Sequence, residues 1–95
     1  FTFDASPDRH MRAAELLAPG AARPDDLRDF LPGVITELMR DIALPNGIGE
    51  VGYTEADVDD LVEGTMKQQR LLATAPREVS EEDAAAILRA SLELW

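Results

Sequence analysis

Cysteine is absent from this 95-residue sequence, and histidine occurs once, as His10. The absence of cysteine excludes disulfide bonds, cysteine-ligated zinc and thiol catalysis. One imidazole cannot complete a usual transition-metal site, and together with the lack of a Gly-x-Ser-x-Gly motif it argues against a hydrolase triad. As a general base or a metal ligand His10 would be functional, but we expect it on the first turn of a helix, facing water or capping locally.

Basic residues are few, with 9 Lys and Arg against 19 Asp and Glu, which gives a formal net charge of −10. Such a chain repels bare phosphate backbones and anionic bilayers, so we expect neither nucleic acid nor a membrane as partner. No apolar run is long enough to span a bilayer, and the N-terminus shows no signal pattern. We expect a cytoplasmic protein. The opening Phe-Thr-Phe alternates like the end of a strand, as if cut from a longer chain.

β-branched and aromatic residues are scarce, whereas Ala, Leu, Glu and Arg are abundant, which favours an all-α fold. Apolar spacing, caps and breakers predict one helical segment over residues 1–95, a bundle of four helices, or five if Pro32 splits the second. Residues 1–5 would be the remnant of a strand or a linker. The expected helices are 6–18, 24–43, 54–69 and 80–94.

Short polar patterns mark where these helices begin and end. Ser6 and Ser80 have the position of N-caps, and Thr54–Asp57 and Ser80–Asp83 have capping-box spacing. The Pro-Asn-Gly at 45–47 predicts a turn, because Asn and Gly tolerate positive φ. This loop also carries Ile48 and Val51, which either close a private core or form one wall of a larger domain.

Two groups of polar residues invite a functional interpretation. Asp57, Asp59, Asp60 and Glu63 could hold a hard cation, although no EF-hand loop is present and a solvated helix face accounts for them better. The polar run 67–70 lies where a helix gives way to a loop, a common position for the lip of a pocket, although ordinary surface is the simpler account. Residue chemistry alone therefore yields no complete catalytic, cofactor-binding or metal site.

The order of the motifs resembles the C-terminal end of the iron-containing (metal-dependent) alcohol dehydrogenase family. That end has Leu-Pro, a loop, Gly, an Asp before an aliphatic residue, Asn-Pro-Arg and a last amphipathic helix. The corresponding residues here are Leu44-Pro45, Gly52, Asp57-Val58, Ala75-Pro76-Arg77 and the helix after Glu82-Asp83. Residues 7–17 and 52–65 are similar to the hydroxyacid–oxoacid transhydrogenase branch, with Met66-Lys67-Gln68 in place of its Leu-Pro-Gln.

The resemblance implies that the chain is part of the helical C-terminal domain of an NAD(P)-linked dehydrogenase acting on an alcohol or 2-hydroxy acid. In this family a divalent metal, commonly iron or zinc, is held by residues that precede the matching segment, so this chain would bind neither metal nor cofactor and would be inactive alone. Its partners would be the missing N-terminal part of the enzyme or another subunit. Gln69, Arg70 and Leu71 would lie at the lip of the substrate pocket. The alternative is a self-contained acidic helical interaction module that binds a basic or amphipathic partner.

Overall fold

The computed structural model describes residues 1–95, which divide into two compact units. One unit comprises residues 2–44, and the other comprises residues 45–95 together with Phe1. All regular structure is helical, so the predicted all-α class is confirmed. No helix combines the length and the apolar character needed to cross a membrane.

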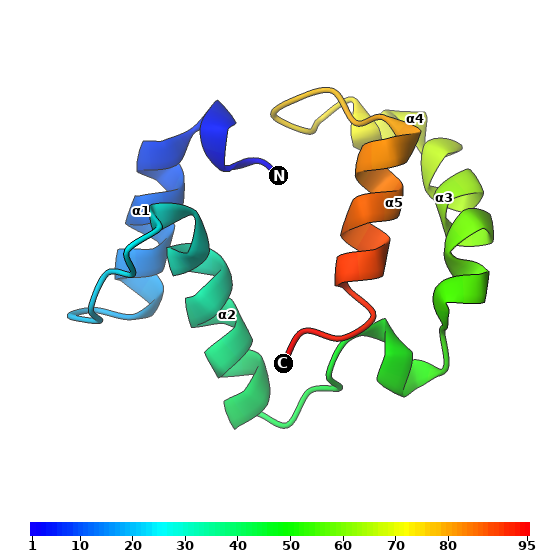
Figure 1. The fold of residues 1–95 in the computed structure, drawn as a ribbon. Coiled ribbons are helices and arrows are strands. Elements are labelled where there is room, and N and C mark those ends of the chain that lie inside the picture. The colour runs from blue at the N-terminus through cyan, green and yellow to red at the C-terminus, as the bar shows by residue number, and fades with distance from the viewer. The chain divides into compact units, whose positions relative to one another are not determined.

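The unit of residues 2–44 is built on two helices, α1 (Pro7–Leu17) and α2 (Phe30–Asp41), that pack against each other (Figure 1). Short 3-10 turns precede each of them, η1 (Phe3–Ala5) and η2 (Leu27–Asp29). Each α-helix contributes one buried residue, Ala14 from α1 and Phe30 from α2. Pro7 occupies the first helical position, where its missing N–H costs no hydrogen bond.

Pro32 sets where α2 can begin. A proline ring clashes with the carbonyl four residues earlier and lacks an N–H to donate, so it is tolerated only within the first turn of a helix. The chain accordingly forms η2 over 27–29 and starts α2 at Phe30, which places Pro32 in its first turn. The helix expected from residue 24 is therefore a 3-10 turn followed by an α-helix, with the break before Pro32.

The unit of residues 45–95 is built on α3 (Val58–Met66) and α5 (Glu81–Ala90), which pack together and bury Val58 and Ala84. Two 3-10 turns, η3 (Ile48–Val51) and η4 (Glu55–Asp57), precede α3. A single turn, α4 (Gln69–Leu72), follows it. Both predicted capping boxes form, at Thr54–Asp57 and at Ser80–Asp83.

The structure differs from the sequence-based expectation at two places near the N-terminus. Residues 3–5 form a 3-10 turn rather than a strand. The side chain of Ser6 makes no capping hydrogen bond, because its backbone, at φ −160° and ψ 73°, lies outside the geometry from which an N-cap oxygen reaches the first turn. The chain as one unit within a larger domain stays a prediction.

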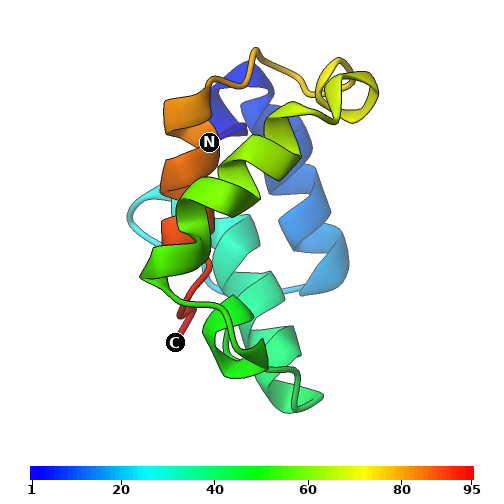
Figure 2. The same cartoon turned by 90° about the vertical axis from the view of Figure 1, so that its right-hand side faces the viewer.

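The predicted Pro-Asn-Gly turn joins the C-terminal residues of the same unit in a loop–tail junction, defined here as residues 46–49 and 91–95 (Figure 2). The backbone N–H groups of Ile48 and Gly49 donate to the carbonyls of Ser91 and Leu92, at 2.8 and 3.0 Å. The Asn46 side-chain oxygen accepts from the N–H groups of Leu94 and Trp95, at 2.8 and 2.9 Å. Main-chain contacts of this kind fix the path of a segment that has no helix or strand of its own.

The core of the chain is small. Only Ala14, Phe30, Val58 and Ala84 are buried, one from each of the four longer helices. Val51 is 60% exposed, so it does not close a private core, while Ile48 is half-buried at the loop–tail junction. The observation favours the second of the two readings of this loop, in which its apolar residues form a wall of something larger.

Candidate functional site

The candidate site is a hollow of about 440 Å³ in the unit of residues 45–95. It lies where α3 gives way to α4 and to the loop that leads to α5. Five of its eight lining residues are apolar, and Gln69, Arg77 and Glu78 are its polar members. The lining residues are Met66, Gln69, Leu72, Ala73, Ala75, Arg77, Glu78 and Val79. A hollow that combines apolar residues with a few convergent polar groups is typical of small-molecule sites.

Arg77 is only loosely paired inside this hollow. Its guanidinium lies 3.5 Å from the Asp83 carboxylate, the longest of the chain's ion pairs. The same Asp83 oxygen already accepts from the backbone N–H and the hydroxyl of Ser80, at 3.1 and 3.0 Å. Those two hydrogen bonds, and then the charge of Arg77, lower the pKa of Asp83. Arg77 also lies over the Phe1 ring at 4.2 Å and donates to the Phe1 carbonyl at 3.5 Å.

Of the three residues predicted to form the lip of a pocket, the structure places only Gln69 in the lining of the hollow. Gln69 lines the hollow and donates a 2.6 Å hydrogen bond from its side chain to the Met66 carbonyl. Arg70 and Leu71 are exposed and are not among the lining residues. Because the two residues follow Gln69 on the single turn of α4, their side chains leave it in other directions. Their role as a lip stays a prediction.

Sequence reasoning passed over Arg77, which it treated only as part of the Ala-Pro-Arg motif. A signal was available, because residues 64–77 contain no Asp or Glu in a chain that has 19 of them. The same stretch carries Lys67, Arg70 and Arg77, three of the chain's nine basic residues. The stretch that supplies most of the lining residues therefore carries only basic charges, whereas the lining itself has one charge of each sign, on Arg77 and Glu78.

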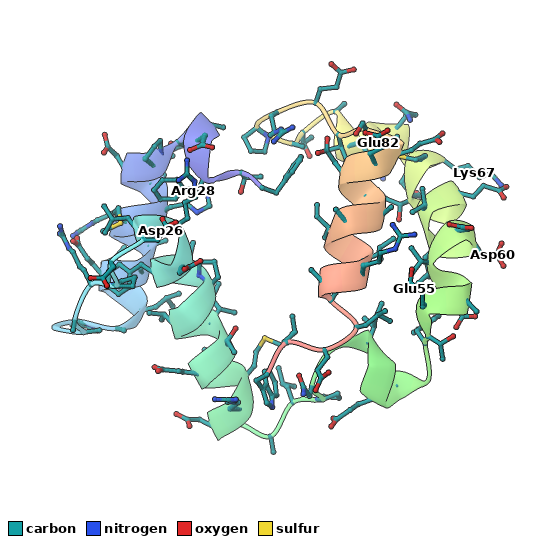
Figure 3. All side chains as sticks on the ribbon, in the orientation of Figure 1. Asp26, Arg28, Glu55, Asp60, Lys67 and Glu82 are labelled. Carbon is teal, nitrogen blue, oxygen red and sulfur yellow. The ribbon has the colours of Figure 1, made fainter.

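Two of the other candidate residues, Asp57 and Glu63, have local partners. The Asp57 carboxylate accepts from the backbone and the hydroxyl of Thr54, both at 2.8 Å, and these bonds lower its pKa. Glu63 pairs with Lys67, and Asp60 lies on the exposed side of α3 (Figure 3). No three His, Cys, Asp or Glu side chains are grouped to hold a metal ion.

His10 is half-buried rather than fully exposed. Its Nε2 lies 3.2 Å from the Thr2 hydroxyl, and its ring meets the edge of Phe3 at 5.6 Å. These neighbours give the only imidazole a local packing role within residues 2–44.

A second hollow, of about 400 Å³, lies beside the start of α2 and has the opposite character. Its charged lining residues are Asp29 and Glu37, and no basic side chain faces it. Of the two hollows, only the one at α4 is lined by side chains that carry hydrogen-bond donors and a positive charge, those of Gln69 and Arg77.

Comparison with known proteins finds enzymes that are similar to this chain along its whole length. Its residues are 39% identical over 99 residues to the mitochondrial hydroxyacid-oxoacid transhydrogenase of Pongo abelii, 38% over 99 residues to that of Homo sapiens and 36% over 97 residues to that of Bos taurus. Each match takes in 100% of this chain and 21% of the relative. This chain matches the C-terminal portion of hydroxyacid-oxoacid transhydrogenases. No protein-family model matches it, and no solved structure does.

These matches confirm the resemblance to hydroxyacid-oxoacid transhydrogenases that was drawn from the motif order. The chain spans about a fifth of the length of the relatives, 21% in each of the three. One expectation is wrong: the matched transhydrogenases are mitochondrial enzymes, which overturns the cytoplasmic location inferred from the absence of a signal pattern. The absence of a signal pattern from a segment that matches about a fifth of its relatives carries no information on organelle, so that inference had no physical basis.

Proposed function

We propose that this chain is the C-terminal helical part of an oxidoreductase that transfers hydride between a hydroxy acid and an oxoacid. The observation that carries the proposal is the match of every part of the chain to 21% of named hydroxyacid-oxoacid transhydrogenases. A match that takes in the whole chain is expected when the segment keeps the packing role that it has in the larger enzyme.

The reacting groups would lie outside this segment. It groups no residues that fit a divalent metal, and it has no glycine-rich loop after a strand that would fit a nicotinamide dinucleotide. A metal such as iron or zinc, and NAD(P), would be held by the remainder of the enzyme. The segment taken alone is accordingly proposed to be inactive, and its contribution is one wall of the substrate pocket.

The remainder of the enzyme, or a second subunit, is also the proposed cover for apolar surface. Three apolar side chains are exposed here: Ile35 and Leu38 of α2, by 40 and 48%, and Ile42 just after its end, by 58%. Their spacing puts them on one side of the helix. Leu71 and Val51 of the other unit are each 60% exposed. Apolar side chains gathered in this way mark surfaces that bind another part of a protein.

A second candidate function is the self-contained interaction module. The same exposed apolar residues support it, so they do not separate the two proposals. The transhydrogenase match favours the enzyme. A self-contained interaction module would not have to keep the packing residues of the enzyme, so we would not expect it to match the enzyme along its whole length.

The experiment is an assay of the full-length gene product loaded with iron or zinc. It would be given 2-, 3- or 4-hydroxybutyrate with a 2-oxoacid acceptor, and the formation of the oxidised and reduced products would be followed by mass spectrometry. We expect turnover of at least one hydroxy acid. A well-folded, metal-loaded enzyme that converts none of these hydroxy acids would contradict the proposal.

A further inference from the structure

We propose that Arg77 binds the carboxylate of the hydroxy-acid or oxoacid substrate in the hollow at α4. The inference rests on the proposed function, which supplies the substrate class. A hydroxy acid and its oxoacid product both carry a carboxylate that does not react, and such a group needs a fixed positive partner.

The hollow supplies that partner with little competition. Arg77 lines it, and the only carboxylate that pairs with Arg77 is Asp83, at 3.5 Å. The Asp83 contact and the N–H donated to the Phe1 carbonyl are both 3.5 Å long, and they leave Arg77 further guanidinium N–H groups for a ligand. Guanidinium offers five N–H donors in a planar fork, which matches the two oxygens of a carboxylate.

The rest of the lining fits a short-chain acid. Met66, Leu72 and Val79 offer apolar surface for a carbon chain, and Gln69 adds an amide beside it. About 440 Å³ lies within the ordinary range of small-ligand pockets. The guanidinium also lies over the Phe1 ring, and a carboxylate would approach it from the side that faces the hollow.

The local charge supports the same ligand. Residues 64–77 carry Lys67, Arg70 and Arg77 and no acid, so this is where an anion would approach a chain of net charge −10. Glu78 is the one acid that lines the hollow, next to Arg77 in sequence. A carboxylate there opposes binding of a second one, so removal of its charge should tighten substrate binding.

The test uses the full-length enzyme with Arg77→Gln, and Lys67→Gln as the matched control. Lys67 lies in the same basic stretch but pairs with Glu63 and points away from α5 (Figure 3), and it is not a lining residue. The readouts are KM and kcat for the best hydroxybutyrate, and the dissociation constant of butyrate by calorimetry. We expect Arg77→Gln to raise KM and the butyrate Kd at least 10-fold with kcat changed less than 3-fold, Arg77→Lys to recover part of the loss, and Lys67→Gln to change each less than 2-fold.

A further variant gives a change of opposite sign. Glu78→Gln should lower the butyrate Kd, about 2- to 5-fold. The proposal is overturned if Arg77→Gln leaves KM and the butyrate Kd unchanged, or if Lys67→Gln raises them equally. If the wild-type enzyme converts no hydroxybutyrate, the proposed function fails, and the comparison of butyrate Kd between wild type and Arg77→Gln still decides whether the hollow binds a carboxylate.

Discussion

The side-chain oxygen of Asn46 lies 2.8 Å from the backbone nitrogen of Leu94, 48 residues further along the chain. The same oxygen accepts from Trp95, and the Asn46 amide nitrogen donates back to the Trp95 carbonyl. One side chain thus satisfies three main-chain groups of a segment that follows the end of α5. The turn after Pro45 is therefore a receptor for the last residues of its unit as well as a change of direction.

Replacement of Asn46 by Ala should release those residues. The substitution removes three hydrogen bonds, at a net cost of about 0.5–1.5 kcal/mol each and less where water replaces them. Hydrogen exchange followed by mass spectrometry should show faster exchange over residues 92–95 in the full-length protein. Asn46→Asp keeps the accepting oxygen but loses the donor and sets a carboxylate oxygen against the Trp95 carbonyl, so it should retain only part of the protection. Equal protection in wild type and Asn46→Ala would contradict the role given to this side chain.

Two glycines of the same unit should respond to alanine in opposite directions. A Cβ on Gly49 would lie 2.6 Å from the Leu92 carbonyl oxygen, whereas a Cβ on Gly64 of α3 meets nothing within 4 Å. We expect Gly49→Ala to lower the free energy of unfolding by about 1–3 kcal/mol through overpacking. Gly64→Ala should raise it by up to about 1 kcal/mol, because alanine is the better helix former. Denaturant titration measures both, and a neutral or stabilising Gly49→Ala would show that the junction is open.

The capping boxes predict loss of stability in acid. Hydrogen bonds from the backbone and hydroxyl of Ser80 lower the pKa of Asp83 in the folded chain, and those from Thr54 lower that of Asp57. A depressed folded-state pKa means that the folded state binds fewer protons than the unfolded one, so the contribution is complete above the unfolded value of about 4 and is lost as the pH falls through the folded value.

This pH dependence can be measured as the melting temperature of the full-length protein between pH 6 and pH 2. Asp83→Asn should lower the melting temperature at pH 6 and flatten its fall below pH 4, since the group that titrates is gone. Asp41→Asn, at the end of α2 and outside both boxes, should leave the acid slope nearly as in wild type. A slope that Asp83→Asn does not reduce would mean that the cap contributes nothing through its charge.

The exposed side of α2 yields a prediction about the complete enzyme. If another part of the protein covers Leu38, then Leu38→Glu buries a charge without a partner and should lower the melting temperature of the full-length enzyme by several degrees. Asp41→Asn, on the same helix, should change it by less than one degree. An unchanged melting temperature for Leu38→Glu would place this side of α2 in water and remove the case for a covering partner.

Local signals in the sequence predicted local structure well. The capping boxes at Thr54 and Ser80 and the proline at the start of α1 each depend on residues within one helical turn, so spacing alone was enough. Pro32 was correctly taken as a disruption, but its place in the first turn of α2 follows from where the preceding 3-10 turn ends. The contacts missed are those between distant residues. Asn46 with Trp95, and Arg77 with the walls of its hollow, depend on packing that no spacing rule describes.

The central claim is that this chain completes an enzyme that moves hydride from a hydroxy acid to an oxoacid. Its most direct test is isotopic: the full-length enzyme receives the hydroxybutyrate that it oxidises, deuterated at the carbinol carbon, together with an unlabelled oxoacid, in ordinary water. The account predicts that deuterium appears at the new carbinol carbon of the reduced acceptor, as seen by mass spectrometry, without passing to solvent. Reduced acceptor without deuterium, or no reduced acceptor from any hydroxybutyrate, would contradict it.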